Sequence, residues 1–196
     1  MLNVGVLVSG GGTNLQALID AERAGTLGPA RVVCAVSSRT DAPALERARL
    51  AGIDAVFIGR KDYADTAAYE MAMADYLKSR GVKLVVLAGF LTILTEGFID
   101  VFNGCVINVH PALIPAFSGK GFYGLKVHER VLASGAEVTG ATVHMVSSEP
   151  DAGPIILQKR VAVLPGDTPE ILQRRVMEEA EWVILPQAVR MIAEGD

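Results

Sequence analysis

Short apolar runs alternate with longer helical segments through the first half of this sequence, and this alternation restricts the fold more than any other feature. The runs predict strands at Asn3–Val8, Arg31–Ser37, Asp54–Ile58, Lys83–Ala88 and Cys105–Val109. The segments between them place apolar residues at helical intervals over Asn14–Arg23, Pro43–Ala51, Asp65–Ser79 and Thr95–Phe102. Strands joined by right-handed helical crossovers form a mostly parallel sheet, and nearly continuous apolar strands indicate that both sheet faces are buried.

The C-terminal half departs from this pattern. A helix is predicted at Lys126–Ala133, followed by strands at Val138–Val146 and Ile155–Val163, whose connection is too short for a crossover helix. Thr168 is expected to cap the last helix, with Pro169 at its first position. We therefore expect one domain over residues 1–196 with an α/β fold. Its sheet would be Rossmann-like, mostly parallel and twisted, with helices on both faces and an antiparallel strand pair in the C-terminal half.

The composition excludes several classes of function. The 18 basic and 22 acidic residues give a formal charge of −4 and form no basic stripe, which argues against nucleic-acid binding. No apolar run is long enough to span a membrane and the sequence opens directly with a strand-like segment, so we expect a soluble, cytoplasmic protein. Cys34 and Cys105 are predicted to be buried small hydrophobes. The three histidines lack the spacing of a zinc site, so no metal is expected.

A glycine-rich turn, SGGGTNLQ, runs from Ser9 to Gln16 after the first strand. Its glycines leave backbone N–H groups bare, and Thr13 with Gln16 resembles a capping box. A helix N-terminus that follows such a turn favours an anion. The turn matches neither the dinucleotide fingerprint nor the Walker loop. It could be a merely tight connection, but we favour a site for the phosphate of a mononucleotide.

Asn108 and His110 stand two positions apart at the end of the fifth predicted strand, so their side chains share one face at the carboxyl edge of the sheet. Asp151, in the loop between the later strands, is a candidate partner for His110. His144 could either border the same pocket or be an inward, hydrogen-bonded polar group. His128 is predicted to be a solvated surface residue, and the loop Ser118–Gly124 to be either a mobile lid or a rigid connector.

Five motifs together carry a resemblance to a known family. They are Ser9–Asn14, Ala88–Phe90, Asn108–Pro115, Gly140–His144 and Asp151–Pro154, and in this order they resemble the folate-dependent phosphoribosylglycinamide formyltransferases over nearly the whole chain. The resemblance implies transfer of a formyl group from the co-substrate 10-formyltetrahydrofolate to the amine of glycinamide ribonucleotide in purine biosynthesis. It implies small-molecule substrates, no metal, no nucleic acid and no membrane, and it leaves monomer and homodimer open.

The resemblance also implies roles for individual residues. Asn108, His110 and Asp151 would be catalytic. Gly12, Thr13 and Asn14 would hold the ribonucleotide phosphate, and Glu181 would touch the ribonucleotide. The folate pocket would be lined by Leu91, Thr92, Ile93, Leu94, Asn108, Ser147, Ser148, Glu149, Pro150 and Asp151.

Formyl transfer needs groups of these types. The amine attacks the formyl carbon, so a developing oxyanion requires hydrogen-bond donors, which Asn108 and a protonated His110 can supply. The leaving nitrogen requires a proton, which the imidazolium can give. We expect Asp151 to raise the pKa of His110 by opposite-charge attraction. No covalent enzyme intermediate is expected, because the amine is itself a good nucleophile.

Three other functions compete with this interpretation. A formyltetrahydrofolate hydrolase would use the same three groups and send the formyl group to water, although such relatives usually carry an additional N-terminal domain. A methionyl-tRNA formyltransferase would be longer and would bind nucleic acid. A non-catalytic nucleotide-binding module would need the glycine-rich turn but not Asn108, His110 and Asp151.

Overall fold

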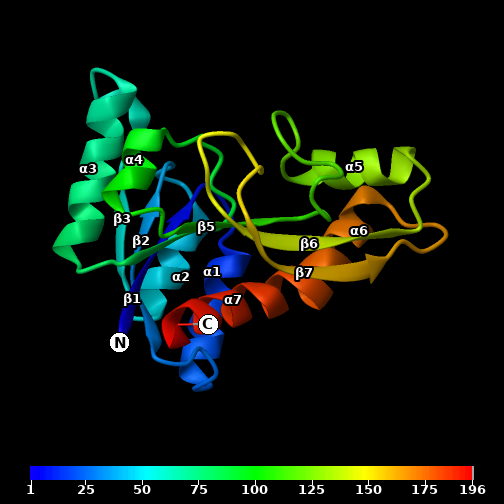
Figure 1. The fold of residues 1–196 in the computed structure, drawn as a ribbon, viewed down its shortest axis with the longest axis horizontal. Coiled ribbons are helices and arrows are strands. Elements are labelled where there is room, and N and C mark those ends of the chain that lie inside the picture. The colour runs from blue at the N-terminus through cyan, green and yellow to red at the C-terminus, as the bar shows by residue number, and fades with distance from the viewer. Residues whose placement is uncertain (196) are drawn as a thin grey trace.

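One seven-stranded sheet forms the centre of the protein, as a computed structural model describes it over residues 1–195 (Figure 1). The strand order is β3-β2-β1-β4-β5-β6-β7. The strands are β1 Leu2–Val8, β2 Ala30–Ser37, β3 Asp54–Phe57, β4 Leu84–Leu87, β5 Val106–His110, β6 Val138–Met145 and β7 Ile155–Ala162. The pairs among β1 to β5 are parallel, whereas β6 is antiparallel to both β5 and β7. The mostly parallel sheet and the antiparallel β6–β7 pair are confirmed.

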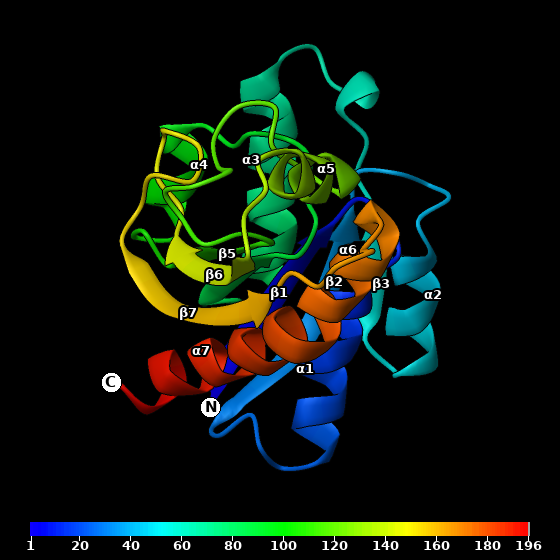
Figure 2. The same ribbon diagram turned by 90° about the vertical axis from the view of Figure 1, so that its right-hand side faces the viewer.

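Helices cover both faces of this sheet (Figure 2). The α-helices are α1 Thr13–Arg23, α2 Pro43–Leu50, α3 Thr66–Ser79, α4 Glu96–Val101, α5 Leu125–Ala133, α6 Pro169–Val176 and α7 Trp182–Glu194. Alternate residues of β1 enter different cores: Val6 joins the core packed by α1, α2, α6 and α7, while Leu7 joins the core packed by α3 and α4. This double burial explains why the central strands read as nearly unbroken apolar runs.

The starts of two helices test the predicted caps. The hydroxyl of Thr168 accepts a hydrogen bond from the N–H of Ile171 and Pro169 follows at the first helical position, as predicted. The predicted capping box at the start of α1 was wrong. Gly12, not Thr13, occupies the N-cap with φ of 73°, and the Gln16 side chain donates to Asp20 instead. A Cβ on residue 12 would lie 2.6 Å from Cβ of Ala44, so close packing as well as the left-handed backbone requires glycine there.

The last helical segment is not a single α-helix. A π-helical turn, Met177–Glu181, joins α6 to α7. A π turn holds more residues than an α turn, so it changes the face that the following side chains present. Glu181, at the end of this turn, is only 6% exposed. The turn therefore directs an acidic side chain toward the interior.

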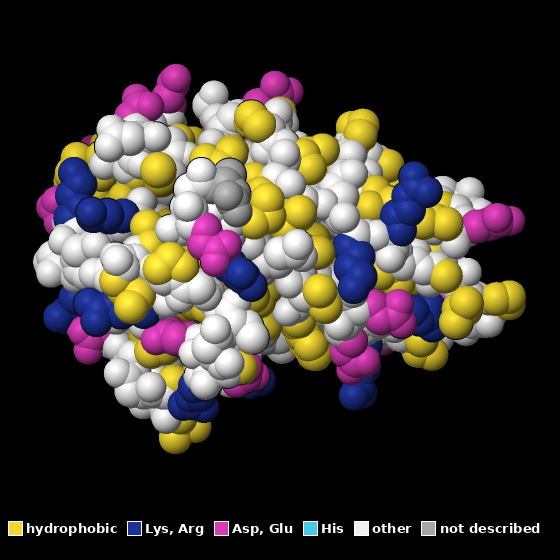
Figure 3. Space-filling view, turned by 60° about the horizontal axis from the view of Figure 1, so that its bottom comes forward, with side chains coloured by type: hydrophobic (Ala, Val, Ile, Leu, Met, Phe, Trp, Pro, Cys, Tyr) yellow, Lys and Arg dark blue, Asp and Glu magenta, His cyan; other side chains and the backbone are white. Residues whose placement is uncertain are grey.

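The surface carries charges of both signs. On the face drawn in Figure 3, Lys and Arg side chains are interspersed with Asp and Glu.

Cys34 is buried, as predicted, and burial raises the pKa of its thiol to about 12. Cys105 is only partly buried. Within residues 1–195, none of the helices combines the length and apolar character needed to cross a bilayer.

Candidate active site

Asn108, His110 and Asp151 meet at the carboxyl end of β5. The amide Nδ2 of Asn108 lies 3.5 Å from Oδ1 of Asp151, and Nδ1 of His110 lies 3.5 Å from Oδ2 of the same carboxylate. Asp151 reaches them from the loop after β6, where its backbone has a positive φ of 58°. Its Oδ2 also accepts a 2.8 Å hydrogen bond from the N–H of Gly119. One carboxylate thus gathers an amide, an imidazole and a loop N–H.

The two ring nitrogens of His110 face different acceptors. Nε2 lies 2.8 Å from the carbonyl oxygen of Phe117, and because a carbonyl only accepts, Nε2 carries a proton. Nδ1, which faces Asp151, then carries a proton only in the imidazolium form. The imidazolium satisfies both acceptors, whereas neutral His110 turns a lone pair toward the carboxylate. While the Phe117 carbonyl holds Nε2, the ring therefore gains and loses its second proton at Nδ1.

Burial dominates the pKa of His110 and lowers it below the ordinary value. Asp151 and the Phe117 carbonyl act in the opposite direction without outweighing burial. The raising effect predicted for Asp151 is present, but desolvation of the ring, which the sequence did not reveal, outweighs it. For Asp151, burial alone would raise the pKa. Its interactions with His144, His110 and the Gly119 N–H outweigh that effect and lower the pKa below the ordinary value, so the carboxylate is ionised.

His144 belongs to the same cluster and fits both of its possible interpretations. It pairs with Asn108 across the β5–β6 ladder and is 1% exposed. Its Nδ1 lies 2.8 Å from the carbonyl of Met145, while Nε2 lies 3.2 Å from the Asn108 amide nitrogen and 3.5 Å from Asp151. It also lines a small cavity beside Asp151. His144 is therefore an inward polar group that also borders the site.

A cavity of about 570 Å³ opens onto these groups, and we call it the His110 cavity. Its walls are Gly89–Ile93, Asn108–Pro111, Gly119–Gly124, Pro150 and Asp151. Six of the residues expected to hold folate therefore line it: Leu91, Thr92, Ile93, Asn108, Pro150 and Asp151. Leu94 and Ser147 line the adjoining small cavity of about 100 Å³. Ser148 and Glu149 are exposed and line neither cavity.

A second cavity, of about 380 Å³, adjoins the first and ends at the glycine-rich turn. This glycine-turn cavity is lined by all four residues expected to hold the ribonucleotide, Gly12, Thr13, Asn14 and Glu181. The Asn14 amide donates to the Glu181 carboxyl group at 2.6 Å, and burial raises the pKa of Glu181 to about 7. The buried Oδ1 of Asn14 has no hydrogen-bond partner within residues 1–195.

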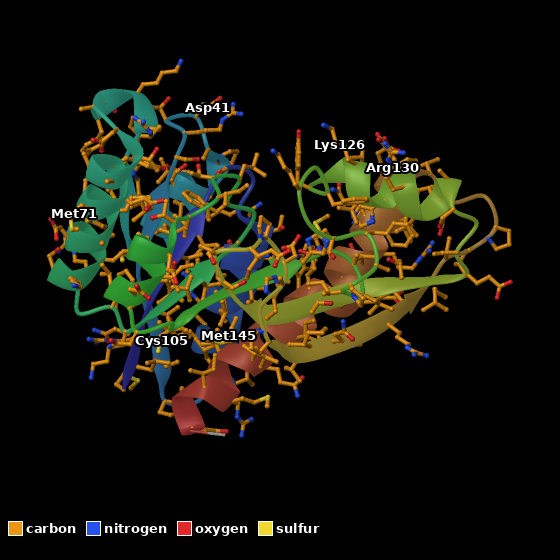
Figure 4. The ribbon with its side chains drawn as sticks, turned by 45° about the horizontal axis from the view of Figure 1, so that its top comes forward. Asp41, Met71, Cys105, Lys126, Arg130 and Met145 are labelled. Carbon is orange, nitrogen blue, oxygen red and sulfur yellow. The ribbon has the colours of Figure 1, made fainter. Side chains whose placement is uncertain are left out.

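His128 lines the glycine-turn cavity, and its predicted surface position was wrong. The side chain is 0% exposed, and neither ring nitrogen has a hydrogen-bond partner in the described part of the chain. Burial, with a smaller contribution from His110, lowers its pKa to about 4, so the ring is neutral. Lys126 and Arg130 extend from the outward side of the same helix α5 (Figure 4). Gln173 and Met177, which the sequence did not suggest, also line this cavity.

A further cavity, of about 640 Å³, lies elsewhere. It is formed between α1 and α7, by residues that include Gln16, Trp182 and Arg190, and it contains none of the three groups gathered around Asp151. Within residues 1–195, no group of three or more His, Cys, Asp or Glu side chains is arranged to hold a metal ion. Asn108, His110 and Asp151 instead line the His110 or adjoining cavities at the end of β5.

Comparison with known proteins defines the class to which this fold and site belong. The family model described as formyl transferase matches residues 2–189, and the chain belongs to that family. It is 38% identical to the phosphoribosylglycinamide formyltransferase of Haemophilus influenzae, over 100% of this chain and 89% of that protein. The chain is therefore a formyl-transferring enzyme.

A solved structure and a longer relative extend the comparison. Glycinamide ribonucleotide transformylase 1 from Symbiobacterium toebii is 45% identical with a TM-score of 0.93, covering 100% of this chain and 89% of that one. The trifunctional purine biosynthetic protein adenosine-3 of Bos taurus is 42% identical over 98% of this chain, which spans only 18% of that protein.

Proposed function

We propose that this enzyme transfers the formyl group of 10-formyltetrahydrofolate to the amine of glycinamide ribonucleotide. The observation that carries the proposal is the junction of two cavities. The His110 cavity and the glycine-turn cavity share wall residues at Gly89, Leu91, Val109, Pro111 and Gly124. An anionic ligand bound at the turn could therefore extend toward the carboxyl end of β5. Two substrates can meet there, which a hydrolase or a simple nucleotide-binding module does not require.

The two cavities suit the two substrates chemically. The glycine-rich turn offers bare N–H groups at the start of α1 for the ribonucleotide phosphate. The raised pKa of Glu181 keeps this side chain largely protonated below about pH 7, which limits its repulsion of that phosphate. The exposed apolar side chains of Leu91 and Ile93, 61% and 58% exposed, offer contact area for the flat ring of the folate.

The reaction then follows from the groups around Asp151. The ribonucleotide amine attacks the formyl carbon, a C–N bond forms, and the formyl oxygen becomes negative. The Asn108 amide and protonated His110 donate to this oxygen. The bond to N10 of the folate breaks as His110 gives N10 a proton, and the attacking nitrogen loses a proton, which restores the imidazolium. Ionised Asp151 stabilises that imidazolium and keeps the ring oriented.

Phe117 immediately precedes the glycine-rich loop 118–124 and contacts His110. Its carbonyl oxygen accepts a hydrogen bond from Nε2 of His110. Its own backbone has a positive φ of 53°, which is rare for a bulky residue. Gly119, Gly121 and Gly124 also have positive φ values. We propose that this loop is a lid whose movement frees Nε2 when substrates bind.

An absorbance assay for loss of 10-formyltetrahydrofolate tests the proposal. Loss that requires glycinamide ribonucleotide supports the transferase. Loss at the same rate without the ribonucleotide identifies a hydrolase, and no loss in either case leaves a binding module. The matched variant is His110→Ala, because a true catalytic reaction must fall sharply with it while a contaminating activity does not.

A further inference from the structure

The wall of the glycine-turn cavity contains no Lys or Arg among the residues that the structure describes, although the proposed ligand carries a phosphate. Three buried polar atoms there have no hydrogen-bond partner within residues 1–195: Oδ1 of Asn14, a residue 8% exposed, and both ring nitrogens of the fully buried His128. Buried polar groups of this kind are expensive to leave unpaired, which points to a polar ligand. The question is how the turn attracts a negative charge.

Arg47 lies directly behind the turn. From α2, its Nε donates to the carbonyl oxygen of Gly11 at 2.8 Å, and its guanidinium also donates to Oε1 of Gln16 at 3.3 Å. The N–H of Ala44 on the same helix donates to the carbonyl of Gly10 at 3.2 Å. Helix α2 thus fixes two successive peptides of the turn, one of them through a positive charge.

The geometry of the peptide bond explains how a charge behind the turn affects its cavity side. In a trans peptide the N–H points opposite to the C=O, so fixing the Gly11 carbonyl toward Arg47 directs the Gly12 N–H away from it. A cation on the carbonyl oxygen also polarises the peptide and makes its N–H a stronger donor. The N–H groups of Gly11, Gly12 and Thr13 donate to no acceptor within residues 1–195.

We propose that Arg47 is a positioning residue for phosphate binding: it orients and polarises the Gly11–Gly12 peptide and supplies the positive charge that the cavity wall lacks. This inference rests on the proposed function, since it takes the ribonucleotide phosphate as the occupant of the turn. Arg47 acts through the backbone and touches no reacting atom. A purely structural clamp would lower stability without distinguishing phosphorylated from unphosphorylated ligands.

The test compares Arg47→Gln with Arg49→Gln by isothermal titration calorimetry. Arg49 lies on the same helix and pairs only loosely with Glu46 at 3.8 Å, so its substitution removes the same charge away from the turn. The probes are glycinamide ribonucleotide and its dephosphorylated ribonucleoside. We expect R47Q to weaken ribonucleotide binding about tenfold, or about 1.4 kcal/mol, with ribonucleoside binding unchanged. R49Q is expected to match the wild type with both probes.

Each result decides something different. Equal binding of the ribonucleotide by R47Q and wild type, or an equal loss with both probes, overturns the role of Arg47. A wild-type protein that binds the two probes equally contradicts the phosphate site itself, and with it this part of the proposed function. Should R47Q fail to fold, Arg47→Met is the variant to test. It keeps a long side chain but removes the charge, and unchanged ribonucleotide affinity in that variant overturns the proposal.

Discussion

His128 makes the stability of the protein depend on pH in a way that can be measured. Burial and the nearby His110 lower its pKa from 6.5 to about 4. The unfolded chain therefore binds this proton more readily than the folded protein. The stability that comes with the neutral ring is fully present above pH 6.5 and is lost as the pH falls toward 4. His128→Phe removes this titration while keeping an aromatic ring of similar shape.

The size of the effect follows from the two pKa values. Each unit between the folded and unfolded pKa corresponds to about 1.4 kcal/mol, so wild type loses about 2 kcal/mol through His128 between pH 7.5 and pH 5. The unfolding free energy of H128F, measured relative to wild type, should rise by about that amount over the same interval. Other titrating groups are present in both proteins and largely cancel in the comparison.

Urea denaturation followed by the fluorescence of Trp182, the single tryptophan, measures this difference at the two pH values. Arg130→Gln is the matched control, because Arg130 is exposed on the same helix. A difference in unfolding free energy between H128F and wild type that is the same at pH 7.5 and pH 5 would contradict this pH dependence. It would mean that the ring is solvated or hydrogen-bonded in the folded protein.

Four further predictions concern the site and one helix cap. His110→Ala should lower kcat by on the order of 100-fold with little change in KM, and a loss below tenfold in steady-state kinetics contradicts the acid role. Asp151→Asn should move the basic limb of the kcat pH profile to lower pH, because the carboxylate opposes the lowering of the His110 pKa; an unmoved limb argues against the pair. Glu181, whose pKa burial raises to about 7, destabilises the folded protein as the pH rises from 4.5 through 7. Glu181→Gln should therefore gain about 3 kcal/mol on wild type between pH 4.5 and pH 8 in urea denaturation, and no gain contradicts its burial. Thr168→Ala should lower the unfolding free energy by about 1 kcal/mol, and an unchanged value in urea denaturation would show that the Thr168 cap does not stabilise the helix.

The sheet was predictable because the burial pattern of each strand is visible in a few consecutive residues. Strands such as β1 and β4 are buried on both faces, so their consecutive residues are apolar. The connection between β6 and β7 is too short for a crossover, so only an antiparallel pairing was possible. The capping box failed because close contact with Ala44, a residue distant in sequence, selects glycine at the N-cap. Local pattern cannot report such a contact.

The polar side chains around the cavities were harder to predict. Asn108 and His110 follow from strand periodicity, but their meeting with Asp151 depends on a loop whose backbone turns through a positive φ. His128 was misjudged because its charged neighbours in sequence suggested a solvated face. A signal was available, since Val127 and Val131 lie on the same side of α5 and both are buried. The net pKa shift of His110 could not be foreseen, because desolvation depends on everything packed around the ring.

Incubation with 10-formyltetrahydrofolate carrying a ¹³C-labelled formyl group, followed by mass spectrometry of the ribonucleotide, tests whether this enzyme moves a formyl group onto the ribonucleotide amine. We predict that the label appears on glycinamide ribonucleotide with the wild-type protein and is nearly absent with His110→Ala. Label recovered as free formate, with the ribonucleotide unlabelled, would contradict transfer to the ribonucleotide.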